Sequence, residues 1–110
     1  MTAQHGKRPT RGIAPGDFPA LREFLRGYFH QDMADEYGSA EGAVRQFCRD
    51  ADAGQRQAVA QEWERLVQQM AGWPLAAMNA ILTEKLGSAY LLGSPEEIKK
   101  ISAVLGGSQA

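Results

Sequence analysis

The chain has 110 residues, of which 44% are hydrophobic and 23% charged, and its formal net charge is −1. These values predict one globular domain with a modest core, and they give no general attraction to nucleic acid or to an anionic membrane. A single cysteine, Cys48, excludes an intrachain disulfide and fits a reducing compartment.

Residues 1–16 are polar, basic and interrupted by proline and glycine, which predicts a flexible N-terminal arm. Its basic residues are not followed by the apolar segment of a secretory signal. Nowhere does an apolar run approach the ~20 residues of a membrane-spanning helix. We therefore expect a cytoplasmic protein whose residues 17–110 form a single helical domain.

The first helix is predicted to begin near 17–19, because Asp17 can cap it and Pro19 suits its first turn. It should end around 30–32. Gly27 lies inside this helix, where glycine costs about 1 kcal/mol relative to alanine, so we expect another element to pack closely there. Hydrophobic residues recur at helical spacing along it; they are Phe18, Leu21, Phe24, Leu25, Tyr28 and Phe29.

Two further helices follow with clear start signals. Ser39 can cap a helix over 40–50, and Asp52 with Gln55 forms a capping-box pattern for a third helix that Gly72 ends. The inner face of the second helix is predicted to contain Ala43, Val44, Phe47 and Cys48. That of the third contains Val59, Trp63, Leu66, Val67 and Met70, so Trp63 is expected in the core.

A fourth helix is predicted from Pro74 to Gly87, and a fifth begins at Ser94, with Pro95 in its first position and Glu97 completing a capping box. Their inner faces contain Leu75, Met78, Leu82 and Leu86, then Ile98, Ile101, Val104 and Leu105. Strand-like alternation is not evident. The predicted fold is therefore all-α, a small bundle of about five helices.

The stretch between the first two helices contains the most unusual chemistry. Residues 31–41 carry Asp32, Asp35, Glu36 and Glu41 without a base, and His30 precedes them. A metal or acid–base site would use these residue types. However, the spacing is poor and a second histidine–carboxylate pair is lacking, so we expect no metal, no cofactor and no enzymatic activity. A solvated loop after a helix end, or a partner-binding surface, explains the stretch better.

The remaining candidates are single residues. Cys48 is expected to be a buried small hydrophobe and not a nucleophile. Trp73 falls in a break between helices, where a core role and an interface role are about equally favoured. The segment 90–92, Tyr-Leu-Leu, is a further candidate for an apolar interface.

A resemblance supports the partner-binding interpretation. The pattern Leu-x-x-Phe-Leu-x-Gly-Tyr-Phe-His-Gln-Asp over 21–32, then Glu-Tyr-Gly-Ser-x-x-x-Ala-Val-x-x-Phe-x-x-Asp over 36–50, is similar to bacterial immunity proteins of contact-dependent growth-inhibition systems. Met33 stands where an aromatic residue is common in that family. The resemblance implies a protein that binds the toxin domain delivered by sibling cells, blocks it in the cytoplasm and does no chemistry.

The partner implied by this resemblance is a cognate toxin domain. Many delivered toxins are nucleases with positive clefts, which carboxylates around an aromatic residue would complement. We therefore predict partner contacts at Asp32, Asp35, Glu36 and Glu41, with Tyr37 as an apolar anchor. Direct binding to nucleic acid or membranes is not expected, and the oligomeric state stays open. The alternatives are a helical adaptor of an unrelated bacterial system and, less favoured, a small metal-dependent enzyme using His30.

Overall fold

The computed structural model describes residues 13–107, and every regular element in that range is helical. The predicted all-α class is confirmed. The helices are α1 (Pro19–Tyr28), α2 (Met33–Tyr37), α3 (Ala40–Asp50), α4 (Ala53–Gln69), α5 (Leu75–Ala80) and α6 (Pro95–Gly107). A 3-10 turn, η2 (Pro15–Asp17), precedes α1, and a π-helix, η3 (Ile81–Lys85), continues α5.

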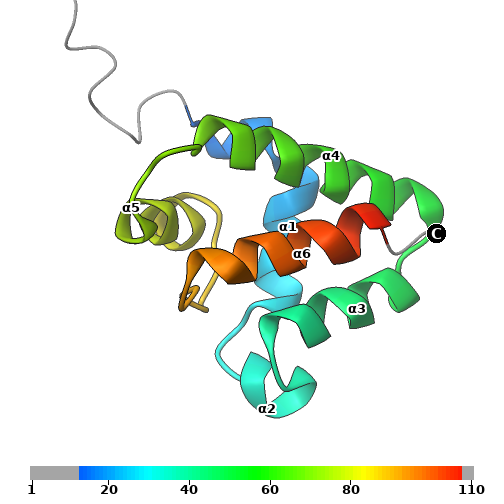
Figure 1. Ribbon diagram of the computed structural model, residues 1–110. Coiled ribbons are helices and arrows are strands. Elements are labelled where there is room, and N and C mark those ends of the chain that lie inside the picture. Colours follow the sequence, from blue (N-terminus) through cyan, green and yellow to red (C-terminus); the bar gives the residue numbers. More distant parts are fainter. Residues whose placement is uncertain (1–12, 108–110) are drawn as a thin grey trace, which may run out of the picture.

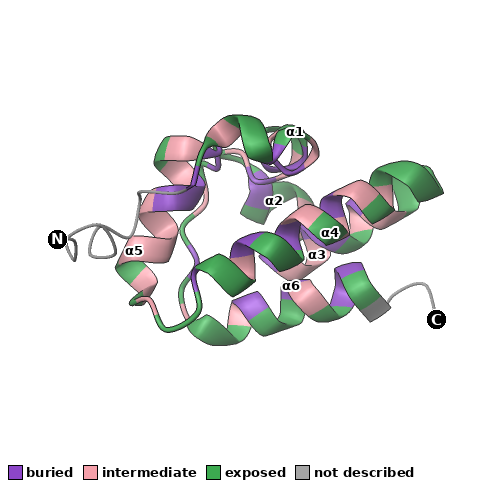
Figure 2. Ribbon diagram, turned by 90° about the horizontal axis from the view of Figure 1, so that it is seen from above, coloured by how far each residue is buried: buried purple, intermediate pink, exposed green. Residues whose placement is uncertain are grey.

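Three helices, α3, α4 and α6, pack around one another through α6. α6 contacts both α3 and α4 and lies between them in the view of Figure 1, whereas Figure 2 shows that it lies to one side of both. α1 runs across the directions of α3 and α4 and packs against both, while α2 extends below α3 in Figure 1. Burial follows the inner faces of these helices, which are purple in Figure 2.

The core includes most of the residues predicted from helical spacing. Trp63 is 1% exposed, and its indole Nε1 donates a 2.8 Å hydrogen bond to Ser102 Oγ, which ties α4 to α6. Cys48 is half-buried and packs against the core, as does Trp73. The largest fully buried side chains besides Trp63 are Phe18, Phe29, Leu21, Leu25, Met33, Leu66, Met70, Ile81, Leu82, Leu86 and Ile101.

The prediction that Asp17 caps the N-terminus of α1 is wrong, because the cap comes from another helix. α1 begins at Pro19, but Asp17 belongs to the preceding 3-10 turn and its side chain caps nothing. Instead, the Glu62 carboxylate of α4 accepts the Leu21 backbone N–H at 2.7 Å. A carboxylate at this position also interacts favourably with the positive end of the helix dipole. The start of α1 is thus fixed by its packing against α4.

The starts of α3 and α4 agree with the prediction. Ser39 Oγ accepts the Gly42 N–H at 3.0 Å. The Asp52 carboxylate accepts the Gln55 N–H at 2.8 Å, and the Gln55 side chain accepts the Asp52 N–H at 3.1 Å, which completes the capping box.

The predicted fourth α-helix differs from the observed one after Ala80. Residues 81–85 form a π-helix, and the Leu86 N–H bonds to the Ile81 carbonyl at 3.1 Å. This five-residue spacing places Ile81 and Leu86 one turn apart on the same face. Both are fully buried, together with Leu82, whereas Leu75 and Met78 are only half-buried. The π-helical turn thus coincides with three buried apolar side chains of this segment.

The connection from η3 to α6 is fixed by side chains. Asn79 makes two hydrogen bonds to the Leu92 backbone, at 3.0 and 2.8 Å. α6 begins at Pro95 as predicted, and the Glu97 carboxylate accepts the Gly93 N–H and the Tyr90 hydroxyl. Leu91, between these contacts, is 60% exposed.

Gly27 does not lie at a close packing contact, contrary to our prediction. A Cβ atom at Gly27 would meet nothing within 4 Å, and the residue is exposed. The glycine that permits close packing is Gly42, where an added Cβ would collide with the backbone carbonyl of Tyr37. Gly42 thus allows the C-terminus of α2 to rest on the first turn of α3.

The N-terminal part of the chain is described only from Ile13, which is 5% exposed and belongs to the core. Residues 1–12 of the predicted arm, with His5, lie outside the described residues. Among residues 13–107, no helix combines the length and apolar composition needed to cross a membrane.

Candidate partner-binding surface

The acidic stretch predicted to be a loop contains the short helix α2. The buried side chain of Met33, 1% exposed, anchors this helix in the core. Gly38, with φ +83°, reverses the chain before α3. A hydrophobic anchor and a left-handed turn therefore hold the stretch as a helix. Burial also gives position 33 a role in the fold and not in surface contact.

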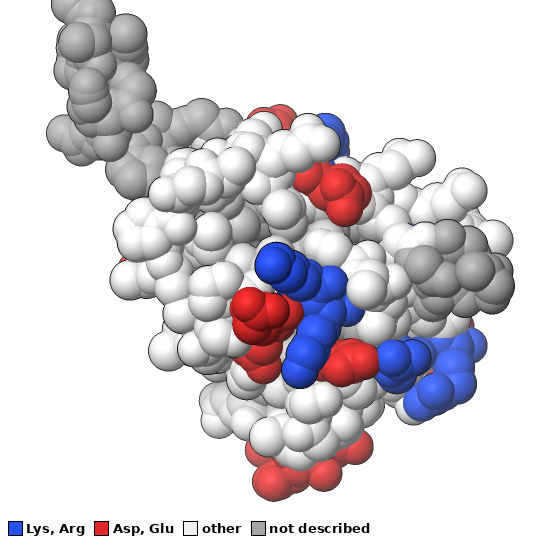
Figure 3. All heavy atoms as spheres, viewed as in Figure 1, with Lys and Arg blue, Asp and Glu red and all other residues white. Residues whose placement is uncertain are grey.

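The carboxylates of Asp32, Asp35 and Glu36 lie on α2 and its N-terminal flank, and all three residues are exposed. These three residues are called the acidic surface below. In Figure 3, acidic side chains gather at the bottom of the molecule, where Figure 1 places α2. The structure thus brings three of the five predicted contact residues together on one small helix.

Tyr37 is half-buried at the inner side of α2 and not freely presented. Its ring stacks on that of Tyr28, with centroids 5.7 Å apart, and it packs against the core. Partial burial raises the pKa of Tyr37, and the neighbouring Glu36 carboxylate adds to this effect. Only part of the ring is therefore available to a partner, and the rest supports α2.

Glu41 lies apart from the acidic surface, on the first turn of α3. Its carboxylate forms a 2.7 Å ion pair with Arg45, one turn later on the same helix. This pairing offsets the charge of Glu41 locally. Glu41 therefore contributes less to the negative potential of this end than the sequence suggests.

His30 is occupied by contacts within this end of the molecule. Its Nδ1 accepts the Asp32 backbone N–H at 3.1 Å, which places the ring proton on Nε2, 3.3 Å from a Glu36 carboxylate oxygen. Among the described residues, no group of three or more His, Cys, Asp and Glu is placed to hold a metal ion. The arrangement positions Glu36 and braces the turn before α2.

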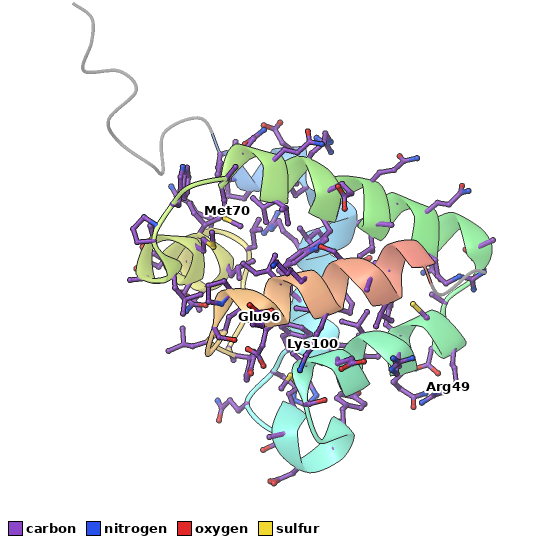
Figure 4. All side chains as sticks on the ribbon, viewed as in Figure 1. Arg49, Met70, Glu96 and Lys100 are labelled. Atoms are coloured by element: carbon purple, nitrogen blue, oxygen red, sulfur yellow. The ribbon has the colours of Figure 1, made fainter. Side chains whose placement is uncertain are left out.

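The front face next to α2 carries charges of both signs. Figure 4 shows Glu96 and Lys100 on the same side of α6. Blue and red side chains alternate across this region in Figure 3. The acidic surface is thus distinct from its mixed-charge neighbourhood.

A pocket of about 650 Å³ lies between α1, α3 and the start of α4, and it was not predicted from the sequence. We call it the interhelical pocket and define it by Glu23, Phe24, Tyr28, Phe47, Asp50 and Asp52. Phe24 and Phe47, with centroids 4.8 Å apart, and the Tyr28 ring form its apolar wall. The three carboxylates belong to exposed residues.

Asp50 is the most firmly held carboxylate of this pocket. It accepts the Tyr28 hydroxyl at 2.7 Å and the Gln46 amide at 2.9 Å. These hydrogen bonds hold the pKa of Asp50 below its ordinary value, and nearby Arg49 contributes. Burial first, then the hydrogen bond to Asp50, raises the pKa of Tyr28 to about 12.

One residue of this pocket, Asp50, is unusual in the sequence for its place in a helix. Asp50 is the last residue of α3, where the negative end of the helix dipole disfavours a carboxylate. An acid at the wrong end of a helix suggests a role other than helix stability. Grouping it with Glu23 and Asp52 required the packing of three helices.

Comparison with known proteins gives one match. The family model described as CdiI immunity protein matches residues 17–89, more than half of the chain. This range contains α1 to η3, with all five predicted contact residues and the interhelical pocket. No curated protein and no solved structure matches the chain.

Proposed function

We propose, because the chain belongs to the CdiI immunity protein family, that it binds and neutralises a cognate toxin domain delivered by neighbouring bacteria. The family match is the observation that carries this proposal. The protein acts in the cytoplasm, where the delivered toxin would do its damage. Its action is stoichiometric binding, and it catalyses no reaction of its own.

The acidic surface is the proposed site of first encounter with the toxin. Asp32, Asp35 and Glu36 are exposed on one short helix, and no Lys or Arg occurs between residues 31 and 41. Such a surface complements a basic toxin surface, of which the substrate cleft of a nuclease is one kind. Charges at this position would act mainly on the association rate. Tyr37 provides apolar contact at its edge, and Glu41, which is paired with Arg45, adds a weaker contact on α3.

The position of α2 suits this role mechanically. Met33 and Tyr37 hold the helix against the core, so its outer carboxylates are presented on a rigid base. Preorganised contacts lose less conformational freedom on binding. The carboxylates can therefore attract a partner without any rearrangement of the fold.

The test begins with the gene directly upstream, which we expect to encode a large secreted toxin. Its toxin domain is expressed in a bacterial host with and without this chain, and growth is measured. Purified toxin domain and immunity protein are then combined, and their association rate is followed at several salt concentrations. Protection and a direct complex are expected. If the chain neither protects nor binds, the immunity proposal is wrong.

The acidic surface is tested by replacing Asp35 and Glu36 together with Lys. A matched control replaces Glu64 and Glu84, which are exposed acids on α4 and η3, with Lys. Both variants change the net charge equally, so a general charge effect would appear in both. We expect the Asp35/Glu36 variant alone to associate at least about tenfold more slowly, with an unchanged melting temperature.

Salt provides a second measurement on the same proteins. Association of the wild type should slow as salt rises, because the Debye length falls from about 10 Å at 0.1 M to about 3 Å at 1 M. The Asp35/Glu36 variant should show a smaller salt dependence. An unchanged association rate and full protection in that variant would remove the acidic surface from the proposal and leave the immunity function itself intact.

A further inference from the structure

We infer that the interhelical pocket receives a cationic side chain, an arginine or lysine, of the toxin domain. The inference rests on the proposed function, because it assumes that a toxin domain binds this chain. It adds a second contact to that of the acidic surface, and Tyr28 adjoins both sites, because its ring lines the pocket and stacks on Tyr37 of α2. The shape, charge and hydrogen bonding of the pocket all favour such a ligand.

The pocket has the dimensions of a binding site. Its volume of about 650 Å³ falls within the range of about 300–1,000 Å³ typical of ligand pockets. Its wall contains the rings of Phe24, Tyr28 and Phe47, which pack against one another with centroids 4.8–5.6 Å apart. Such a wall suits the methylene chain of an arginine or lysine, and aromatic rings attract the cation at its end.

The charge of the pocket has one sign. Glu23, Asp50 and Asp52 are among its lining residues, and none of the described residues that line it is Lys or Arg. The positive end of the α4 dipole also reaches the pocket, but the Asp52 carboxylate already caps it by accepting the Gln55 N–H. Arg49 follows Cys48 on α3, donates to the Gln46 side chain, and projects away from the bundle in Figure 4.

Asp50 is prepared to accept a further hydrogen bond. Each of its oxygens receives one bond, from Tyr28 and from Gln46, so each retains a free lone pair. These two bonds fix the direction of the carboxylate. A guanidinium group can pair with such a carboxylate through two parallel hydrogen bonds. Asp50 therefore offers a cation a preorganised partner next to an aromatic wall.

The dipole of α3 does not favour a charge on Asp50. A carboxylate on the last residue of α3 opposes the helix dipole, and a neutral residue there would favour the helix. Exceptions of this kind to local rules concentrate at functional sites. This observation is independent of the pocket geometry, and both favour a cationic ligand.

The first experiment uses a minimal probe. N-acetyl-arginine amide is titrated into isotopically labelled full-length protein, and N-acetyl-norleucine amide serves as the neutral control of similar shape. Backbone amide shifts are followed by NMR. We expect saturable shifts around the pocket, including Ala51 and Gly54, with the arginine probe binding at least tenfold more tightly. Absence of shifts there, or equal binding of both probes, would overturn the inference.

The second experiment uses the toxin domain and a double variant, Glu23→Gln with Asp50→Asn. The amide at position 50 keeps an oxygen that can accept the Tyr28 hydroxyl, so the aromatic wall should persist, and an unchanged melting temperature would verify this. The matched control is Glu64→Gln with Glu84→Gln. We expect the pocket variant alone to bind toxin and arginine probe at least tenfold more weakly. Unchanged toxin affinity in the pocket variant would refute the inference.

The outcomes separate this inference from the proposed function. Failure of the proposed function appears as no toxin binding by the wild type, whereas failure of the inference appears as toxin binding that ignores the pocket. Two other occupants are distinguishable without any probe. If deletion of residues 1–12 shifts the pocket amides, the chain's own basic segment occupies the pocket. If dilution shifts them, a second copy does. Either result overturns the inference.

Discussion

Replacement of Trp63 by alanine provides a quantitative test of the proposed packing. The side chain is 1% exposed on the inner face of α4, and its Nε1 donates a 2.8 Å hydrogen bond to Ser102 on α6. It therefore contributes both apolar burial and a specific link between two helices. The variant removes both at once and leaves a cavity between α4 and α6.

The expected loss follows from these contacts. Truncation of a buried tryptophan to alanine costs about 3–5 kcal/mol in unfolding free energy. A domain of this size has about 5–15 kcal/mol in total, so this one change should remove a large part of it. Trp63→Phe keeps most of the ring but loses the N–H donor, and should cost about 1–2 kcal/mol. Ser102→Ala, which removes only the acceptor, should cost about 1 kcal/mol.

Urea unfolding monitored by the helical circular dichroism signal measures these differences. Glu64→Ala is the control, because Glu64 is exposed on the same helix and its loss should change stability by less than about 0.5 kcal/mol. A loss below about 1 kcal/mol for Trp63→Ala would mean that the ring is not in the core. The packing of α4 against α6 would then be wrong, and Trp63 would become a candidate for the interface.

Three further predictions test other parts of the structure. Phe29→Ala, at a position 1% exposed, should also lower the unfolding free energy by about 3–5 kcal/mol in urea. A loss below about 0.5 kcal/mol, which is typical of a surface position, would contradict the burial of this ring. Gly42→Ala should destabilise the protein, because the new Cβ would meet the Tyr37 carbonyl oxygen. Gly27→Ala has open space around its Cβ and should stabilise the protein by about 1 kcal/mol. Melting temperatures that shift in the same direction for both variants would refute this contrast. The pKa of Tyr28 is raised to about 12 in the folded protein. The protonated Tyr28 hydroxyl therefore stabilises the fold fully below its ordinary pKa of about 10, and this stabilisation is lost as the pH rises through about 12. Ultraviolet titration of the phenolate should show Asp50→Asn lowering the pKa of Tyr28 and leaving that of Tyr90, also about 12, unchanged.

Many features of the fold followed from local sequence. Ser39 and the Asp52–Gln55 pair cap α3 and α4 as predicted, because these contacts join residues only three positions apart. The burial of Trp63 followed from helical spacing alone. The carboxylates at 32, 35 and 36 were also recognisable from sequence as an exposed acidic group, since no base lies among them.

Other features depended on residues distant in sequence, which local patterns do not contain. Glu62, and not Asp17, caps α1 because α1 packs against α4. The π-helix η3 forms where Ile81 and Leu86 are both buried in the core, whereas the local pattern predicts a continuous α-helix. Met33 in the core turns a predicted loop into α2, and Gly42, not Gly27, accepts a neighbouring backbone.

The same distinction applies to the two proposed contact sites: the acidic surface was recognisable from the sequence, and the interhelical pocket was not. The sequence by itself determined the all-α class, the helix starts at 40 and 53, and the acidic character of the stretch before α3. Tertiary structure decided that Glu23, Asp50 and Asp52 share one aromatic-walled pocket. The reason is physical: capping and periodicity act within a few residues, whereas a pocket exists only where separate helices pack against one another.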